Sequence, residues 1–256
     1  MSTEFPTVPG GARLALKYVS KFPPSKEEST KKTDSGESGP RWLVLGCREG
    51  TTAIALASEY AVSVLGVDDD AEALMAARFF QQQARLKGSV QYRFMELDAL
   101  DLPEHSFSAI ISEGNQARIP LPRLVDLARS LLQNDGLLYL LDAVWLQRPV
   151  PTYVKDVWET VERPVHTLEE ACEIVSGHGL KVRVTADETR ALAAFYSGHI
   201  DAVRAAGKRP EYSSGEMKKI LLKYKHEVDV YTRHKGKKWM GYGVIVAEKP
   251  SEQPQS

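Results

Sequence analysis

The sequence predicts an α/β fold with a doubly wound, mostly parallel sheet of seven strands. From residue 41 onward, short apolar runs alternate with amphipathic segments, which is typical of strands alternating with covering helices. The first apolar run ends in a glycine turn (RWLVLGCREG), and the second ends in three aspartates (VLGVDDD). A last apolar run, GYGVIVAE, follows two long helical patterns.

The composition permits a substantial hydrophobic core and argues against a nucleic-acid-binding, membrane-spanning or secreted protein. The chain has 256 residues, of which 43% are hydrophobic, and a formal net charge of −1. No overall basic field is present to neutralise phosphates, so nucleic acid is not the expected partner. No apolar run is long enough to span a membrane, and MSTEFPTVPGG lacks the basic and apolar segments of a secretory signal. Two cysteines and scattered histidines predict a cytoplasmic protein without a disulfide framework or a metal site.

The first half of the chain carries the clearest strand and helix signals. A short amphipathic helix is expected at 11–22, and the segment 23–40 has no aliphatic or aromatic residue, which predicts a flexible linker. Asn134-Asp135-Gly136 is a helix stop and turn signal before the fifth strand. In this half we expect strands at 42–45, 61–67, 90–95, 107–111 and 137–141, and helices at 51–60, 71–87 and 121–132.

The second half is less regular and is expected to contain a helical insertion. A proline-flanked segment with a tryptophan spans 150–163. Further helices are expected at 168–178, 188–206 and 214–234, with strands at 181–185 and 241–248. We therefore divide the chain into an N-terminal helix and linker (1–40), a core that binds a cofactor (41–145), a helical cap for the substrate (146–240), and a final strand with a disordered tail (241–256).

The glycine turn and the aspartates after the second strand indicate a nucleoside-containing cofactor. Gly46 and Gly50 let the backbone approach a ligand that a side chain would block. The start of the following helix offers unpaired N–H groups. Asp68, at the tip of the second strand, can accept both hydrogen bonds of a ribose diol.

The order of these motifs resembles the class I S-adenosylmethionine-dependent methyltransferases over Arg41 to Asp142. The first-strand motif of that family is similar to LVLGCREG, and its ribose-binding acid corresponds to Asp68. The family's loop after the third strand resembles DALDLPEHSF, and its fourth-strand end resembles IISEG. The stretch ARSLLQNDGLLYLLD looks like the family's next helix, turn and strand. The resemblance implies a Rossmann-like methyltransferase fold whose last strand is antiparallel.

The resemblance also implies which residues hold the cofactor, S-adenosylmethionine. Asp98 and Ala99 would flank the adenine, and Ser112 and Glu113 would lie near the methionine part. The acids Asp69 and Asp70 are expected to cap the next helix, although Asp69 can also approach the cofactor. The full set of expected cofactor-binding residues is Gly46, Cys47, Arg48, Gly50, Asp68, Asp69, Asp98, Ala99, Ser112 and Glu113.

Two positions depart from the family's pattern. Val44 stands where the family has an acid, and Arg48 stands where it has the middle glycine. Arg48 can reach the cofactor's carboxylate, because guanidinium pairs well with that group. The other reading is a protein that kept the fold and lost the cofactor. The four-residue separation of Gly46 and Gly50 argues against a nicotinamide dehydrogenase, which carries G-x-G-x-x-G.

The resemblance predicts methyl transfer to a small molecule, since the cap region is large enough to cover a pocket. No catalytic residue is assigned, because in-line methyl transfer needs mainly proximity and alignment. His166 and His199 are candidate bases or ordinary packing residues. Aromatic side chains of the cap are either a lid over the substrate or ordinary packing: Trp145, Tyr153, Trp158, Phe195 and Tyr196. The alternatives are a catalytically silent scaffold and, from the basic run at 218–238, an RNA- or protein-modifying enzyme. The acceptor and the oligomeric state are left open.

Overall fold

The computed structural model describes residues 8–24, 41–116, 118–206 and 215–251. The expected linker at 25–40 and the tail at 252–256 lie outside these ranges. Within them, none of the helices combines the length and the apolar character that crossing a bilayer requires.

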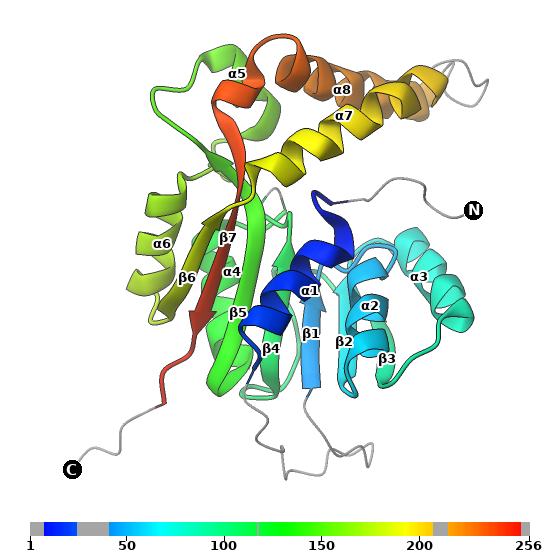
Figure 1. Ribbon diagram of the computed structural model, residues 1–256, viewed down its shortest axis with the longest axis vertical. Helices are drawn as coiled ribbons and strands as arrows, with labels where there is room; N and C mark the ends of the chain where they lie inside the picture. Colours follow the sequence, from blue (N-terminus) through cyan, green and yellow to red (C-terminus); the bar gives the residue numbers. More distant parts are fainter. Residues whose placement is uncertain (1–7, 25–40, 117, 207–214, 252–256) are drawn as a thin grey trace.

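A seven-stranded sheet forms the centre of the molecule, in the order β3-β2-β1-β4-β5-β7-β6 (Figure 1). The pairs from β3 to β5 are parallel, whereas β7 runs antiparallel to both β5 and β6. This confirms the predicted mostly parallel sheet with an antiparallel last strand. The strands are β1 Arg41–Leu45, β2 Ser63–Asp68, β3 Ser89–Phe94, β4 Phe107–Glu113, β5 Leu132–Trp145, β6 Lys181–Asp187 and β7 Met240–Glu248.

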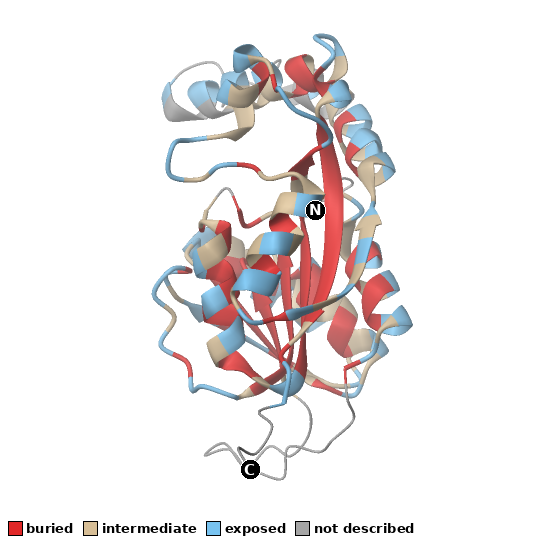
Figure 2. Ribbon diagram, turned by 90° about the vertical axis from the view of Figure 1, so that its left-hand side faces the viewer, coloured by how far each residue is buried: buried red, intermediate tan, exposed pale blue. Residues whose placement is uncertain are grey.

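Helices cover both faces of this sheet, as expected for strands that are apolar on both sides. The helices are α1 Gly11–Lys21, α2 Thr51–Glu59, α3 Ala71–Gln83, α4 Leu121–Leu131, α5 Thr152–Trp158, α6 Leu168–Gly177, α7 Thr189–Ala206 and α8 Gly215–Thr232. Buried side chains of α1, α2 and α3 join the core on one face, while those of α4 and α6 join the core on the other. The central strands are buried along most of their length (Figure 2).

The N-terminal helix is fastened to the rest of the fold at two places. Its buried face, which includes Leu14 and Tyr18, packs in the same core as α2. The Tyr18 hydroxyl donates to Glu188 Oε1 at 2.6 Å, immediately before α7. Because Glu188 lies between β6 and α7, this bond connects α1 to the base of the cap.

Helices α5, α7 and α8 gather beyond the carboxyl end of β5 and form the cap (Figure 1). Its aromatic residues pack on one another: Trp158 lies edge-on to Trp145, and Tyr196 stacks on Tyr231 with ring centroids 4.3 Å apart. The Tyr196 hydroxyl donates to Glu227 Oε1 at 2.6 Å and accepts from Trp158 Nε1 at 3.1 Å. Of the two readings of the cap aromatics, these contacts support ordinary packing for Trp145, Trp158 and Tyr196.

Strand β5 is longer than the sequence predicted. It begins at Leu132 rather than at Leu137, so that Asn134-Asp135-Gly136 lies within the strand and not in a turn before it. Asp135 has a positive φ of 59°, and the register to β4 shifts between Phe107 and Ala109. The turn residues therefore produce a local irregularity in a strand that pairs with both neighbours.

Candidate cofactor site

The turn after β1 is built from left-handed backbone. Gly46, Arg48 and Gly50 have φ values of 60°, 50° and 74°. The Gly50 N–H donates to the Cys47 carbonyl at 2.8 Å, which closes the turn, and the Cys47 N–H donates to the Val67 carbonyl at 3.0 Å. Glycine adopts this backbone without strain, whereas Arg48 does so at a cost of roughly 1–2 kcal/mol.

Asp68 connects this turn to the end of β2. Its Oδ2 accepts the Arg48 backbone N–H at 2.8 Å and Arg118 Nη1 at 3.3 Å, and its Oδ1 accepts the Asp70 N–H at 3.0 Å and Arg118 Nη2 at 2.8 Å. Burial raises the pKa of Asp68, but the bonds from Arg118 and the backbone outweigh it and lower the pKa below its ordinary value. The carboxylate is therefore ionised, and its four acceptor positions are all used.

The two aspartates after Asp68 have different roles. Asp70 is the N-cap of α3 and accepts the N–H groups of Glu72 and Ala73 at 2.9 and 3.0 Å, as predicted. Asp69 forms an ion pair with Arg118 instead of capping the helix.

The end of β4 places a second carboxylate beside the turn. Glu113 is 5% exposed, and its Oε2 accepts the Thr52 hydroxyl at 2.5 Å from the first turn of α2. Burial raises the pKa of Glu113 to about 7, with Thr52 and the Arg48 charge opposing the shift. Burial likewise raises the pKa of Asp142 on β5 to about 6, against hydrogen bonds from the Gln116 and Ala143 N–H groups.

Asn115 closes the space above the first glycine. Its Nδ2 donates to the Leu45 carbonyl at 2.7 Å and to Ser112 Oγ at 3.1 Å, so its Oδ1 is an acceptor. A Cβ at Gly46 would lie 2.9 Å from Arg118 Nη1 and closer still to Asn115 Oδ1. Only glycine fits at this position.

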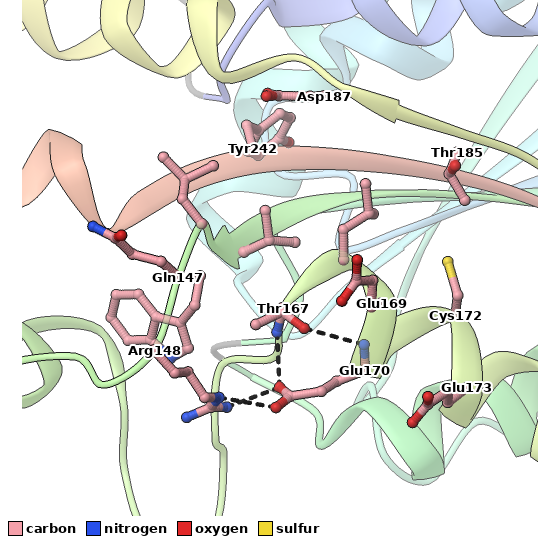
Figure 3. A pocket seen from close by; sticks show the side chains of 14 residues that line it. Gln147, Arg148, Thr167, Glu169, Glu170, Cys172, Glu173, Thr185, Asp187 and Tyr242 are labelled. Carbon is pink, nitrogen blue, oxygen red and sulfur yellow. Dashed lines mark hydrogen bonds and ion pairs between the residues drawn. The ribbon is translucent and has the colours of Figure 1, made fainter.

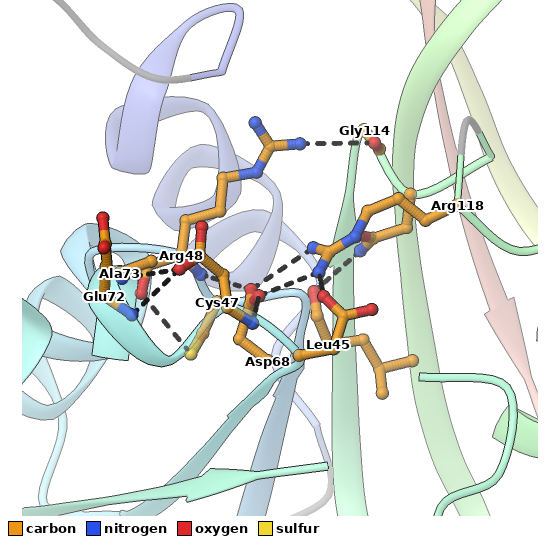
Figure 4. Close-up of polar contacts among 11 residues, drawn as sticks. Leu45, Cys47, Arg48, Asp68, Glu72, Ala73, Gly114 and Arg118 are labelled. Atoms are coloured by element: carbon orange, nitrogen blue, oxygen red, sulfur yellow. Dashed lines mark hydrogen bonds and ion pairs between the residues drawn. The ribbon is translucent and has the colours of Figure 1, made fainter. Parts of the chain in front are cut away.

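A cavity of about 380 Å³ lies over the turn and the end of β2. Figure 4 shows Arg48 and Arg118 extending from opposite sides of the crevice, with Asp68 below them. Arg48 Nη2 reaches the Gly114 carbonyl at 3.4 Å. The cavity is lined by Arg48, Glu49, Asp68, Asp69, Asp70, Ala73 and Arg118.

Some expected site residues do not contribute side chains to this cavity. Asp98 and Ala99 are exposed in the loop after β3, and neither lines it. Ser112 is fully buried, with its hydroxyl turned to Asn115. Cys47 is buried, and burial raises the pKa of its thiol to about 12, so the group is an unreactive thiol at neutral pH.

Arg118 and Asn115 are the residues that sequence reasoning missed. Both follow β4 in the segment GNQAR, and polar residues at the carboxyl end of a parallel strand were the available signal. Their partners, however, come from β1 and β2, 70 and 50 residues away. Only the strand order β2-β1-β4 brings them together.

A second cavity, of about 690 Å³, lies at the far edge of the sheet between the end of β5, α6 and β6. Figure 3 shows the side chains of Glu169 and Glu173 on α6 and Asp187 on β6 around it. Arg148 donates to both carboxylate oxygens of Glu170 at 2.9 and 2.8 Å. Cofactor candidates from the sequence are not among the lining residues.

The match to known proteins agrees with this geometry. Residues 43–136 match the family model described as a methyltransferase domain. The segment contains the end of β1, all of β2 to β4, the glycine turn, Asp68 and Glu113. This match agrees with the resemblance to the class I S-adenosylmethionine-dependent methyltransferases, for which S-adenosylmethionine is the expected cofactor.

Solved structures share the fold of this chain at low sequence identity. A Haemonchus contortus phosphoethanolamine N-methyltransferase 2, in complex with phosphomonomethylethanolamine and S-adenosylhomocysteine, has a TM-score of 0.73 and 16% identity. The alignment covers 95% of this chain and 54% of that one, so the chain spans about half of that enzyme. The [4+2]-cyclase SpnF has a TM-score of 0.72 and 16% identity, with 94% and 81% covered.

Geranyl diphosphate methyltransferase in complex with S-adenosylmethionine has a TM-score of 0.65 and 13% identity, with 93% of this chain and 85% of that one covered. No curated protein matches the sequence. At these identities the solved structures establish the fold of the chain alone.

The residues present fit S-adenosylmethionine. The cavity lies over the glycine turn, and a diol can take the two positions on Asp68 that Arg118 holds. Among the described residues, the buried acceptors Glu113 Oε1 and Asn115 Oδ1 have no hydrogen-bond partner. Such acceptors call for a ligand that donates hydrogen bonds, and the cofactor has an ammonium, an adenine amine and two hydroxyls.

The conformation of the turn can be tested at Gly50. Gly50→Ala is expected to lower the free energy of unfolding by about 2–4 kcal/mol, because φ is positive and a Cβ would lie 2.9 Å from Ala77 Cβ and closer still to the Tyr92 ring. Gly177→Ala is the control, since nothing lies within 4 Å of its Cβ position at the end of α6. Urea unfolding measures both, and equal effects would contradict this description of the turn.

The ion pair over Asp68 can be tested at Arg118. Arg118→Ala is expected to lower the unfolding free energy at pH 7 by about 1–3 kcal/mol. Because the pKa of Asp68 is lowered in the fold, its contribution is present above its unfolded pKa and lost as pH falls through the folded pKa. The effect should therefore shrink in acid.

Urea unfolding at pH 7 and at acid pH measures this difference. Arg123→Ala is the matched control, because that exposed arginine on α4 donates only to the Asp98 carbonyl among the described residues. It should change stability by less than about 0.5 kcal/mol. A loss for Arg118→Ala that does not depend on pH would contradict the ion pair.

Proposed function

We propose that this protein is an S-adenosylmethionine-dependent methyltransferase that acts on a small molecule in the cytoplasm. The observation that carries the proposal is the pairing of the left-handed glycine turn with Asp68 at the adjoining strand end. This arrangement offers a ribose-binding carboxylate beside a backbone that a ligand can approach. The small number of cysteines supports the compartment.

The cap supports a small acceptor rather than a polymer. Helices α5, α7 and α8 lie beyond the carboxyl end of β5, at the same end of the sheet as the cofactor crevice. A pocket between a sheet and a cap can enclose a small ligand. Two of the similar structures are named as enzymes that methylate phosphoethanolamine and geranyl diphosphate, both small molecules.

The chemistry asks the protein chiefly to align two reactants. When bound, S-adenosylmethionine supplies a methyl group on a sulfonium, which is a good leaving group. Asp68 and the glycine turn would hold the nucleoside, and the loop after β4 would orient the methionine part. The cap would exclude water and align the acceptor behind the methyl group.

A second candidate is a protein of this fold that no longer transfers methyl groups. Arg118 takes two of the four acceptor positions of Asp68, and Arg48 holds a left-handed backbone where glycine fits without strain. The [4+2]-cyclase among the similar structures also has a name that does not mention methyl transfer. A protein of this second kind can still bind the cofactor, so a binding measurement does not distinguish the two candidates fully. Methyl transfer from labelled cofactor to small molecules of a cell extract distinguishes them, because only the proposed enzyme carries it out.

Calorimetry with S-adenosylhomocysteine tests the site. Asp68→Asn is expected to weaken binding about ten- to hundredfold, because a carboxylate that accepts two hydroxyl hydrogen bonds becomes an amide. Lys218→Ala, on the exposed start of α8, is the control and should leave affinity unchanged. Equal losses in the two variants would mean that the site lies elsewhere, and no binding by the native chain at millimolar ligand would remove the proposal.

A further inference from the structure

Next to the glycine turn, outside the lining of the crevice, the fold buries a carboxylate oxygen without a donor. Glu113 is 5% exposed, and Thr52 satisfies only its Oε2. Among the described residues, Oε1 is buried and has no hydrogen-bond partner. An unsatisfied buried charge is costly, so a native structure that keeps one has a use for it.

The strand register places this oxygen next to the glycine turn. β1 pairs with β4 so that Leu45 lies opposite Ser112, which puts Glu113 level with Gly46. On β1 itself the side chain two residues before Gly46 is Val44, which is 1% exposed and packed in the apolar core. Glu113 on β4 therefore places a carboxylate beside the start of the turn, where β1 itself presents an apolar side chain.

A cation already lies near this carboxylate. The Arg48 guanidinium reaches the carbonyl of Gly114, the residue after Glu113, and its charge opposes the raised pKa of Glu113. Arg48 is only partly buried and belongs to the lining of the open cavity. Its side chain can therefore move toward solvent, whereas Glu113 cannot.

We propose that Glu113 is the anionic partner of the ammonium group of S-adenosylmethionine, and that this ammonium replaces the Arg48 guanidinium beside it. The inference rests on the proposed function, because it assumes that the cofactor binds in this crevice. The exchange leaves one positive charge beside the carboxylate before and after binding, so no buried charge is left unpaired. A hydrogen-bond donor on the ligand then satisfies Oε1. Glu113 is a binding residue that supplies on β4 the acid that β1 lacks.

Calorimetry with two ligands tests the assignment. The ligands are S-adenosylhomocysteine and its deaminated analogue, which keeps the carboxylate and lacks only the amine. In the native chain, loss of the amine should weaken binding about ten- to hundredfold. In Glu113→Gln the two ligands should bind with nearly equal affinity. Glu72→Gln, which removes an exposed carboxylate from α3, should retain the full difference.

Two further variants complete the test. Glu113→Asp keeps the carboxylate but shortens the side chain by one methylene. Loss of the ligand's amine should therefore weaken binding less in this variant than in the native chain. This variant tests the assignment if Glu113→Gln does not fold. Arg48→Gly should bind S-adenosylhomocysteine several-fold more tightly, since no side chain must be displaced. Weaker binding by Arg48→Gly would show that Arg48 holds the ligand's carboxylate, and would overturn the exchange.

The outcomes separate this inference from the proposed function. If the native chain binds neither ligand, both fall. If it binds S-adenosylhomocysteine, and loss of the amine weakens binding equally in the native chain and in Glu113→Gln, only the proposed role of Glu113 is contradicted.

Discussion

The hydrogen bond from the Arg48 backbone N–H to Asp68 holds the candidate site together. It fastens the turn after β1 to the end of β2 at 2.8 Å, in a place where three residues have positive φ. Ionisation of Asp68 is favoured by this bond and by Arg118, which together overcome the effect of burial on its pKa. The same carboxylate therefore shapes the turn and offers the acceptor positions that a ribose needs. A change at Asp68 alters the structure of the turn as well as its binding chemistry.

Much of the fold follows from the sequence because its signals are local. The apolar runs, the glycines at 46 and 50, and Asp70 as a helix cap are each decided within a few residues. The predicted start of β5 was wrong: Leu132 already pairs with Phe107 of β4, and the turn signal Asn134-Asp135-Gly136 falls at the irregularity before the regular pairing resumes at Leu137. Arg118 and Asn115 escaped notice for another reason: each contacts a strand at least 50 residues away, and sequence order does not show which strand ends adjoin.

The candidate site brings positive and negative side chains into direct contact with one another. Two arginines and several carboxylates meet at the carboxyl ends of β1, β2 and β4, and buried Glu113 and Asp142 lie behind them. The arginines contact groups that a cationic, hydroxyl-rich ligand would also contact. We therefore expect binding to exchange hydrogen-bond partners at the carboxylates, with the side chains of Arg48 and Arg118 moving. The aromatic residues of the cap pack on one another beyond the carboxyl end of β5.

A crystal structure of the chain with S-adenosylhomocysteine tests the central claim most directly. We expect the sugar hydroxyls to lie within hydrogen-bond distance of Asp68, in the positions that Arg118 Nη1 and Nη2 now hold. The ligand backbone would then cross Gly46. A structure obtained at saturating ligand in which Arg118 still covers Asp68, with the ligand absent or bound elsewhere, would contradict it.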